Sequence, residues 1–571
     1  MRPSTFVLLV AFVPVFAAAQ APQPTPSAVV PQPPTTLPLK HAPQPTTAAI
    51  SEADLMTRLY IFADDSMQGR EAGTIGNVKG TDYIAGQVKQ LGLVPAGDGG
   101  SYFQTIPFKT RTIDPASTVA VGGVPMTFGT EWAALSPDSA SGSDLPVIYG
   151  GVLGDSASMI SPDQMAGKMV FLAFGPNSLR AYGSVGRLTR TAAATAVLLP
   201  PQFLTFLAQP RQFVDDPGAT VPTTKVTIFL APASAAKLFD EPIARLKPGA
   251  AGKPLSFSIR SNTEAVPFPA RNVVAILPGA DPKLKGEYVA IGAHNDHVGF
   301  NHAPVEHDSI RIYNHIVRPG GAEDQAARAT PEQQEEVNAL LADWRGAHPG
   351  TSRPDSISNG ADDDGSGSMS VLEIAEKLAA NPHPKRSVLF VWHVGEEKGL
   401  LGSAYFTDHP TVPRDSIVAQ LNMDMVGRGD AWDMTGTTKE GAEIHGNPNY
   451  LQIVGSRRLS TELGDVIEKV NTEGRHGLAF DYAIDANGHP ANIYCRSDHY
   501  EYARYGIPIA FFTTGGHSDY HQVTDEPQYI DYAHMAKVDN FVADLAVRVA
   551  NLDHRIVVDH PKPNPAAACQ Q

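Results

Sequence analysis

Four apolar runs in the second half of the chain constrain its fold more than any other feature. They read EYVAIGAH from Glu287, SVLFVWHVGEE from Ser387, SIVAQLNMDMVG from Ser416 and IPIAFFTTGGH from Ile507. Strands that are apolar on both faces belong to sheets that helices cover on both sides. A helical pattern between the first two runs places apolar residues on one face, namely Met369, Leu372, Ala375 and Leu378. The chain after Asn272 is therefore predicted to be an α/β domain with three layers, α/β/α.

Histidines and carboxylates follow the carboxyl ends of these runs, where ligands bind in such sheets. They are His294, Asp296, His297, Glu396, Glu397, Asp424, His517 and His521, and Asp362–Asp364 precede the helix between the first two runs. Neighbouring carboxylates such as Glu396 and Glu397 repel unless a cation lies near them. Imidazole together with carboxylate suits zinc, and less often cobalt or manganese. These residues predict a divalent metal site.

A chain of 571 residues is expected to form two or three domains, and the remaining segments differ from the α/β part in composition. Residues 115–267 contain short β-type runs separated by glycine, proline and serine, which predicts a β-rich module. Residues 20–48, rich in proline, are expected to form a disordered linker, and residues 559–571 a disordered tail. The catalytic part is expected over 49–114 and 268–558.

The amino terminus predicts export to the periplasm or the exterior. Within residues 1–19, Arg2 precedes an apolar stretch from Phe6 to Phe16, and alanines follow as a cleavage site. The stretch is shorter than the ~20 residues that span a bilayer, and no stable membrane insertion is expected. The net charge of −16 argues against a nucleic-acid partner. Two cysteines, Cys495 and Cys569, suggest no disulfide framework.

The motifs around the candidate ligands resemble those of the co-catalytic di-zinc aminopeptidases of metallopeptidase family 28, which also includes glutamate carboxypeptidase II. They stand here as GAHNDHVG, NGADDDGSG, GEEKGLLGS, NMDMVG and HSDYHQVTDEP, and similarity covers most of residues 51–550. The resemblance implies the zinc-exopeptidase fold, of the phosphorylase/hydrolase-like type. Residues 115–267 resemble a protease-associated domain inserted into that fold.

The resemblance also implies a ligand set for two Zn²⁺ ions per chain. It assigns His294, Asp363 and Asp424 to one ion, and Glu397, His521 and the shared Asp363 to the other. The peptide bond that follows Asp363 is expected to be cis.

Catalytic roles follow from the same resemblance. Glu396 would accept a proton from the attacking water and return it to the leaving amine. Asp296 would hold the ring of His294 through its other nitrogen, and Tyr494 would donate a hydrogen bond to the oxyanion. The implied activity is the removal of N-terminal residues from peptides with a free N-terminus.

Two alternatives stay open at this point. A dipeptidase or carboxypeptidase on the same scaffold would want arginines for the substrate carboxylate, and Arg428 and Arg496 lie next to the motifs. A non-catalytic, receptor-like protein is disfavoured because every ligand and Glu396 are present.

The chain departs from the family pattern in an insertion over 301–358, near the expected active site. Thr330 and Gln333 form a capping box before a predicted helix at 331–346. Three histidines of the insertion, His302, His307 and His315, are expected in a solvated loop. This segment puts the substrate specificity in doubt.

Overall fold

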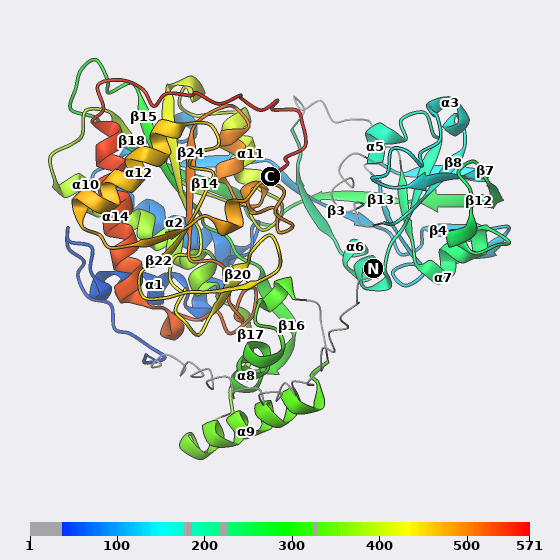
Figure 1. The fold of residues 1–571 in the computed structure, drawn as a ribbon, viewed down its shortest axis with the longest axis horizontal. Helices are drawn as coiled ribbons and strands as arrows, with labels where there is room; N and C mark the ends of the chain where they lie inside the picture. The colour runs from blue at the N-terminus through cyan, green and yellow to red at the C-terminus, as the bar shows by residue number, and fades with distance from the viewer. Residues whose placement is uncertain are drawn as a thin grey trace, which may run out of the picture.

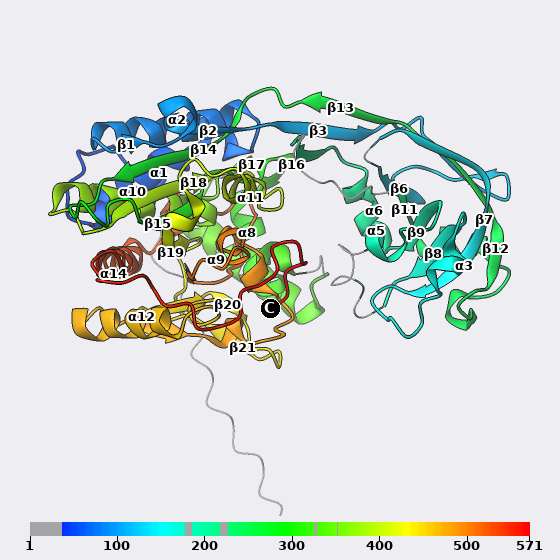
Figure 2. The same ribbon diagram turned by 90° about the horizontal axis from the view of Figure 1, so that it is seen from above.

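The computed structural model describes residues 37–571 apart from 137, 176–177, 179–184, 217–225, 325–327 and 351. The predicted export signal and the first part of the linker lie outside the described residues. Figures 1 and 2 show two lobes joined by the strands β3 (Phe108–Ile113) and β13 (Ser261–Ala265). Both strands belong to a three-stranded sheet with β10 (Arg211–Val214).

The larger lobe is built on a mixed sheet of nine strands in the order β1-β14-β18-β15-β19-β24-β22-β23, with β2 paired to β14. The four apolar runs form its centre, where β18, β15, β19 and β24 run parallel. The strands are β1 (Val94–Pro95), β2 (Phe103–Ile106), β14 (Ala270–Leu277), β15 (Tyr288–His294), β18 (Ser387–His393), β19 (Ile417–Met423), β22 (Tyr450–Val454), β23 (Ala479–Asp481) and β24 (Ile509–Thr513).

Helices cover both faces of this sheet, which confirms the predicted three-layer fold. Val289 and Ile291 of β15 face one core, whereas Ala290 between them faces the other. Helices on the first face are α1 (Glu52–Phe62), α2 (Ile75–Gln90), α10 (Gly367–Ala380), α12 (Thr461–Gly474) and α14 (Tyr532–Ala550), and those on the second are α11 (Leu401–Asp408) and α13 (His499–Ala503). In the described part of the chain, no helix is both long and apolar enough to cross a bilayer.

The smaller lobe has its own eight-stranded sheet in the order β5-β4-β12-β7-β8-β9-β11-β6, with separate cores on its two faces. Its strands are β4 (Thr118–Val121), β5 (Val124–Pro125), β6 (Trp132–Leu135), β7 (Ala140–Val152), β8 (Met169–Ala173), β9 (Ala194–Leu198), β11 (Thr227–Leu230) and β12 (Ala251–Ile259). Its short helices are α3 (Pro162–Met165), α5 (Val185–Leu188), α6 (Pro201–Leu207) and α7 (Pro232–Ala235). Its resemblance to a protease-associated domain stays a prediction.

The insertion forms a small projection of the larger lobe. It consists of β16 (Gly299–Glu306), α8 (His307–Val317), α9 (Pro331–Ala347) and β17 (Pro354–Ser358). Helix α9 starts with the predicted capping box and lies at the outer edge of the molecule (Figure 1). Two of the three histidines are not in a solvated loop, because His307 hydrogen-bonds Asp355 and Tyr529, and His315 stacks on Trp432. The side chain of His302 lies outside the described residues.

The described part of the proline-rich linker, residues 37–48, packs on the larger lobe. The Tyr60 hydroxyl donates to the Pro38 carbonyl at 2.5 Å, and the Thr46 hydroxyl donates to Glu376 at 2.8 Å. The backbone N–H of Gln44 donates to the hydroxyl of Thr57. This part is therefore not the free tether that its composition suggested, because its polar groups find partners on α1 and α10.

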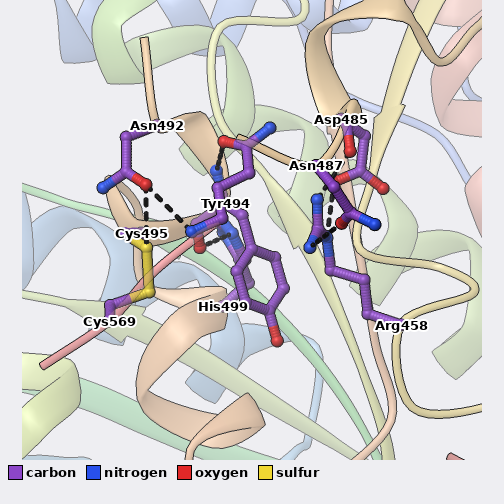
Figure 3. Close-up of a disulfide and its surroundings, with 9 residues drawn as sticks. Arg458, Asp485, Asn487, Asn492, Tyr494, Cys495, His499 and Cys569 are labelled. Atoms are coloured by element: carbon purple, nitrogen blue, oxygen red, sulfur yellow. Dashed lines mark hydrogen bonds and ion pairs between the residues drawn. A yellow bond between two sulfur atoms is a disulfide. The ribbon is translucent and has the colours of Figure 1, made fainter. Parts of the chain in front are cut away.

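The C-terminal residues also differ from the expectation of a disordered tail. A disulfide joins Cys495 to Cys569, with 5.7 Å between the Cα atoms (Figure 3). The side chain of Gln571 donates to the Ile484 carbonyl at 2.6 Å and accepts from the Tyr494 N–H at 3.0 Å. The prediction of no disulfide was wrong, because the partners are 74 residues apart and no local pattern reveals the pairing.

Candidate metal centre and active site

The carboxyl ends of the central strands meet at one edge of the sheet and carry the candidate ligands. Strand β15 ends at His294, β18 leads to Glu397, and β19 leads to Asp424. His521 lies in the loop after β24, and Asp363 lies in the turn before α10. Parallel strands bring these residues together because their carboxyl ends face the same way.

A first group of donors consists of His294, Asp363 and Asp424, whose ligand atoms all lie within 4.8 Å of one another. The Nε2 atom of His294 is 3.1 Å from Asp363 Oδ1 and 3.7 Å from Asp424 Oδ1. All three side chains are buried. The hydroxyl of Ser497 donates to Asp424 Oδ2 at 2.7 Å and so fixes that carboxylate.

A second group contains Glu397, His521, His297 and the same Asp363. The Nε2 atom of His521 lies 2.9 Å from Glu397 Oε2 and 3.0 Å from Asp363 Oδ2. His297, which the resemblance did not assign as a ligand, has its Nδ1 atom 2.8 Å from Glu397 Oε1. Asp363 is therefore the one carboxylate common to the two groups.

Three donor atoms in these groups lack a hydrogen-bond partner, and this tests whether a cation fits. Among the buried atoms without a hydrogen bond are the Nε2 atoms of His294 and His521 and the Oδ2 atom of Asp363. Leaving a buried polar atom unsatisfied costs about 1–3 kcal/mol. Imidazole and carboxylate donors that converge and lack partners fit a divalent cation of the zinc type.

Neighbouring carboxylates fix the backbone of this region. Asp525 accepts hydrogen bonds from the N–H groups of Asp362 and Asp363, at 2.9 and 3.0 Å. Asp364 accepts from the N–H groups of His294 and Met425 and so ties β15 to the end of β19. The peptide bond between Asp363 and Asp364 is cis, as the resemblance implied.

Asp296 acts differently from the expectation. The Nδ1 atom of His294 lies 3.0 Å from the carbonyl oxygen of Asp296, whereas the nearest oxygen of the carboxylate is 3.8 Å away. That carboxylate instead accepts from the backbone N–H groups of Gly395 and Glu396, at 2.7 and 3.2 Å. Asp296 therefore holds the ring through its main chain and the loop of Glu396 through its side chain. Burial raises the pKa of Asp296 to about 7.

Glu396 faces the cavity beside the metal centre rather than joining either donor group. Burial raises its pKa well above the ordinary range of a glutamate, and the nearby carboxylates of Asp424 and Glu397 add to the effect. A bound cation would supply the opposing charge. The adjacent glutamates thus face different surroundings, Glu397 among the donors and Glu396 toward open space.

A cavity of about 280 Å³ extends from this centre. Asp363, Glu396 and Asp424 line its metal end. Its other end is mostly apolar and is lined by Met434, Ile484, Ile493 and Phe511. The insertion contributes Gly320, Glu323 and Asp324 to the wall.

Tyr494 does not lie where the sequence analysis expected it. It is not among the described residues that line the cavity, and the guanidinium of Arg458 lies 4.5 Å over its ring. Figure 3 shows Tyr494 between Arg458 and His499, near the disulfide. The tyrosine that lines the cavity is Tyr520, and its position next to His521 in the motif was the signal that could have revealed it.

The two arginines near the motifs have different surroundings. Arg428 is buried and pairs with Asp433 at 2.7 Å and Asp519 at 2.9 Å, so it is not available to a ligand. Arg496 lines the cavity and donates to Glu323 of the insertion at 2.5 Å.

Comparisons with known proteins match part of the chain to one family. Residues 343–546 match the model of peptidase family M28. Leupeptin-inactivating enzyme 1 of Streptomyces exfoliatus is 29% identical over 198 residues, which cover 33% of this chain and 38% of that protein. A probable leucine aminopeptidase of Arthroderma benhamiae is 34% identical over 131 residues, which cover 22% and 33%. The chain thus matches about a third of the length of these curated relatives.

The fold is similar to that of the aminopeptidase from Aneurinibacillus sp. strain AM-1, with a TM-score of 0.50 and 17% identity, over 90% of this chain and 98% of that one. The family match includes Asp363, Glu396, Glu397, Asp424 and His521. Residues 343–546 are thus similar to peptidase family M28, and the fold of the chain is similar to that of a solved aminopeptidase.

Proposed function

We propose that this protein is an exported, zinc-dependent aminopeptidase that removes N-terminal residues from peptides. The observation that carries the proposal is the pair of donor groups that share Asp363, have ligand atoms without partners, and adjoin a cavity lined by Glu396. The family match and the leucine aminopeptidases among the relatives support it.

In this proposal the two donor groups hold one zinc ion each, with Asp363 shared between them. His294 and Asp424 complete one set of ligands, and Glu397 and His521 complete the other. The ions would polarise the scissile carbonyl and lower the pKa of a water molecule near them.

Glu396 moves the proton in this scheme. Its carboxylate accepts the proton of the attacking water and delivers it to the leaving amine. Asp296 positions it, because the Asp296 carboxylate binds the N–H of Glu396 itself. Tyr520 lines the same cavity, and burial raises its pKa well above the ordinary range, so its hydroxyl stays protonated and available to the oxyanion.

The charges around the cavity favour binding of the free amine of a substrate over binding of its carboxylate. Five of the described lining residues are acidic, namely Glu323, Asp324, Asp363, Glu396 and Asp424. A carboxypeptidase would need an arginine free to bind a carboxylate. Arg428 is buried between two aspartates, and Glu323 offsets the positive charge of Arg496, so a substrate carboxylate must compete with Glu323 for it.

Two observations support the proposal that the protein is exported. The first nineteen residues have the order of an export signal. The disulfide between Cys495 and Cys569 suits an oxidising compartment. N-terminal sequencing of the protein recovered from outside the cytoplasm should start after Ala19, and an intact Met1 would argue against cleavage.

The decisive experiment uses the purified full-length protein loaded with zinc. A leucyl tripeptide should be cleaved at its first bond, and its C-terminal amide should be cleaved similarly. The N-acetylated tripeptide should be resistant because the free amine is lost. The reverse pattern would move the assignment to a carboxypeptidase with the same metal centre and base.

A further inference from the structure

The insertion reaches the active-site cavity through one short turn rather than through its helices. The backbone N–H of Ala322 donates to the carbonyl of Tyr520 at 3.1 Å, which docks the turn beside the metal centre. Gly321 has a φ of +60°, and a Cβ there would lie 2.8 Å from that carbonyl, so the close approach requires glycine. The docked turn brings Glu323 to the cavity wall.

Glu323 meets Arg496 at this wall. Among the described residues that line the cavity, Arg496 is the only arginine or lysine. Its backbone is held on both sides, because Cys495 forms the disulfide and Ser497 hydrogen-bonds Asp424. The guanidinium places a positive charge in the cavity wall, and Glu323 accepts its hydrogen bond.

The ion pair is weak enough to exchange. The side chains of Arg496 and Glu323 are 37% and 54% exposed, and exposed pairs contribute about 0–1 kcal/mol. A carboxylate from a ligand can accept two parallel hydrogen bonds from a guanidinium, which makes it a good competitor for Glu323. In a dipeptide substrate, the C-terminal carboxylate belongs to the residue directly after the scissile bond. In longer peptides it lies farther from that bond.

We propose that Arg496 is a specificity-determining residue that binds the carboxylate of dipeptides, and that Glu323 of the insertion competes with that carboxylate. The insertion thereby lowers the preference for dipeptides relative to longer or amidated peptides. This inference rests on the proposed aminopeptidase function and deepens it, since it names the substrate class that the pair selects against.

The test compares Leu-Gly with Leu-Gly amide, which differ only in the carboxylate. Glu323→Gln should raise the ratio of kcat/KM for Leu-Gly to that for the amide about fivefold, because the competing charge is removed. Glu323→Gln combined with Arg496→Met should abolish this gain. Glu335→Gln on the exposed face of α9 makes the same charge change in the same insertion and should leave the ratio at the wild-type value. A ratio unchanged by Glu323→Gln, within twofold, overturns the proposal.

Calorimetry separates failure of this inference from failure of the proposed function. In a Glu396→Gln background, Glu323→Gln should tighten the binding of Leu-Gly about fivefold and leave that of Leu-Gly amide unchanged. If the wild-type protein cleaves neither peptide, the aminopeptidase proposal fails, while calorimetry still decides whether Arg496 binds the carboxylate. Equal binding of both peptides in all variants would refute the role of Arg496.

Discussion

The two ends of the cavity are built in different ways. At the metal end, each donor follows a strand of the central sheet or precedes α10, and buried carboxylates such as Asp525 fix the backbone. At the apolar end, Phe511 belongs to β24, whereas Met434 and Ile484 come from segments outside the central sheet, and the C-terminal Gln571 donates to the carbonyl of Ile484. The chemistry therefore lies on rigid elements, and the recognition surface lies on segments that are far apart in the sequence.

This difference separates what each end controls. Changes at the metal end should lower metal content and kcat, because the donors and Glu396 lie there. Changes at the apolar end should alter KM and the ranking of substrates, since its lining residues Met434, Ile484, Ile493 and Phe511 belong to neither donor group. The predictions below test this division.

The largest effect is expected for Asp363→Asn, which removes the carboxylate common to both donor groups. Both metals should be lost together, and turnover of a leucyl reporter should fall at least about 10⁴-fold, the upper end of what loss of a base alone costs. Metal analysis of the folded variant, checked by circular dichroism, measures the result. Retention of one tightly bound ion would contradict a shared carboxylate.

The next largest effect is expected for Glu396→Gln. An amide cannot accept the proton, so kcat should fall about 10²–10⁴-fold with the metal content unchanged. Glu397→Gln is the matched control, because the same substitution one residue away removes a ligand and should lower metal content. Identical metal content and identical residual rates in both variants would contradict the separate roles of Glu396 as base and Glu397 as ligand.

Sequence reasoning reached the metal end because its signals are local. His294, Glu397 and Asp424 each follow an apolar run, so the fold alone brings them together. His297 was among the residues predicted to form the metal site, but the resemblance gave it no ligand role, and its contact with Glu397 joins the ends of β15 and β18.

The apolar end could not be predicted in the same way. Tyr494 stood within a motif, yet its ring packs under Arg458, which lies 36 positions earlier and contacts it only in the folded chain. The Cys495–Cys569 bond and the contact of Glu323 with Arg496 join segments that carry no shared pattern. Such walls depend on tertiary packing, which no periodicity encodes.

A moderate effect is expected from Ile484→Ala at the apolar end. The side chain is 6% exposed and lines the cavity, so its loss enlarges the space that would hold a substrate side chain. The value of kcat/KM for a leucyl substrate should fall about tenfold, and that for an alanyl substrate should change less, because fewer apolar contacts are lost. Metal content should stay constant. Equal losses for both substrates would show that Ile484 does not contact the substrate side chain.

The smallest effect on activity is expected from Cys569→Ser, which releases the C-terminal segment from the loop behind the cavity. The disulfide spans 74 residues, and its loss should lower the free energy of unfolding by about 2–4 kcal/mol. The loop from Ile484 to Arg496 would lose one of its anchors, while the hydrogen bonds of Gln571 to it remain possible. We therefore expect KM for a leucyl substrate to rise only a few-fold, with kcat and metal content unchanged.

Reduction of the disulfide in the wild-type protein should reproduce the Cys569→Ser result. Gln571→Ala in the oxidised protein removes the side-chain hydrogen bonds of the tail and keeps the disulfide, so it measures their separate contribution. Kinetics and thermal unfolding of the same samples measure both consequences. If Cys569→Ser lowered kcat or metal content and left KM alone, the C-terminal segment would support the metal end through Ser497 and Asp424, and the two ends of the cavity would not be independent.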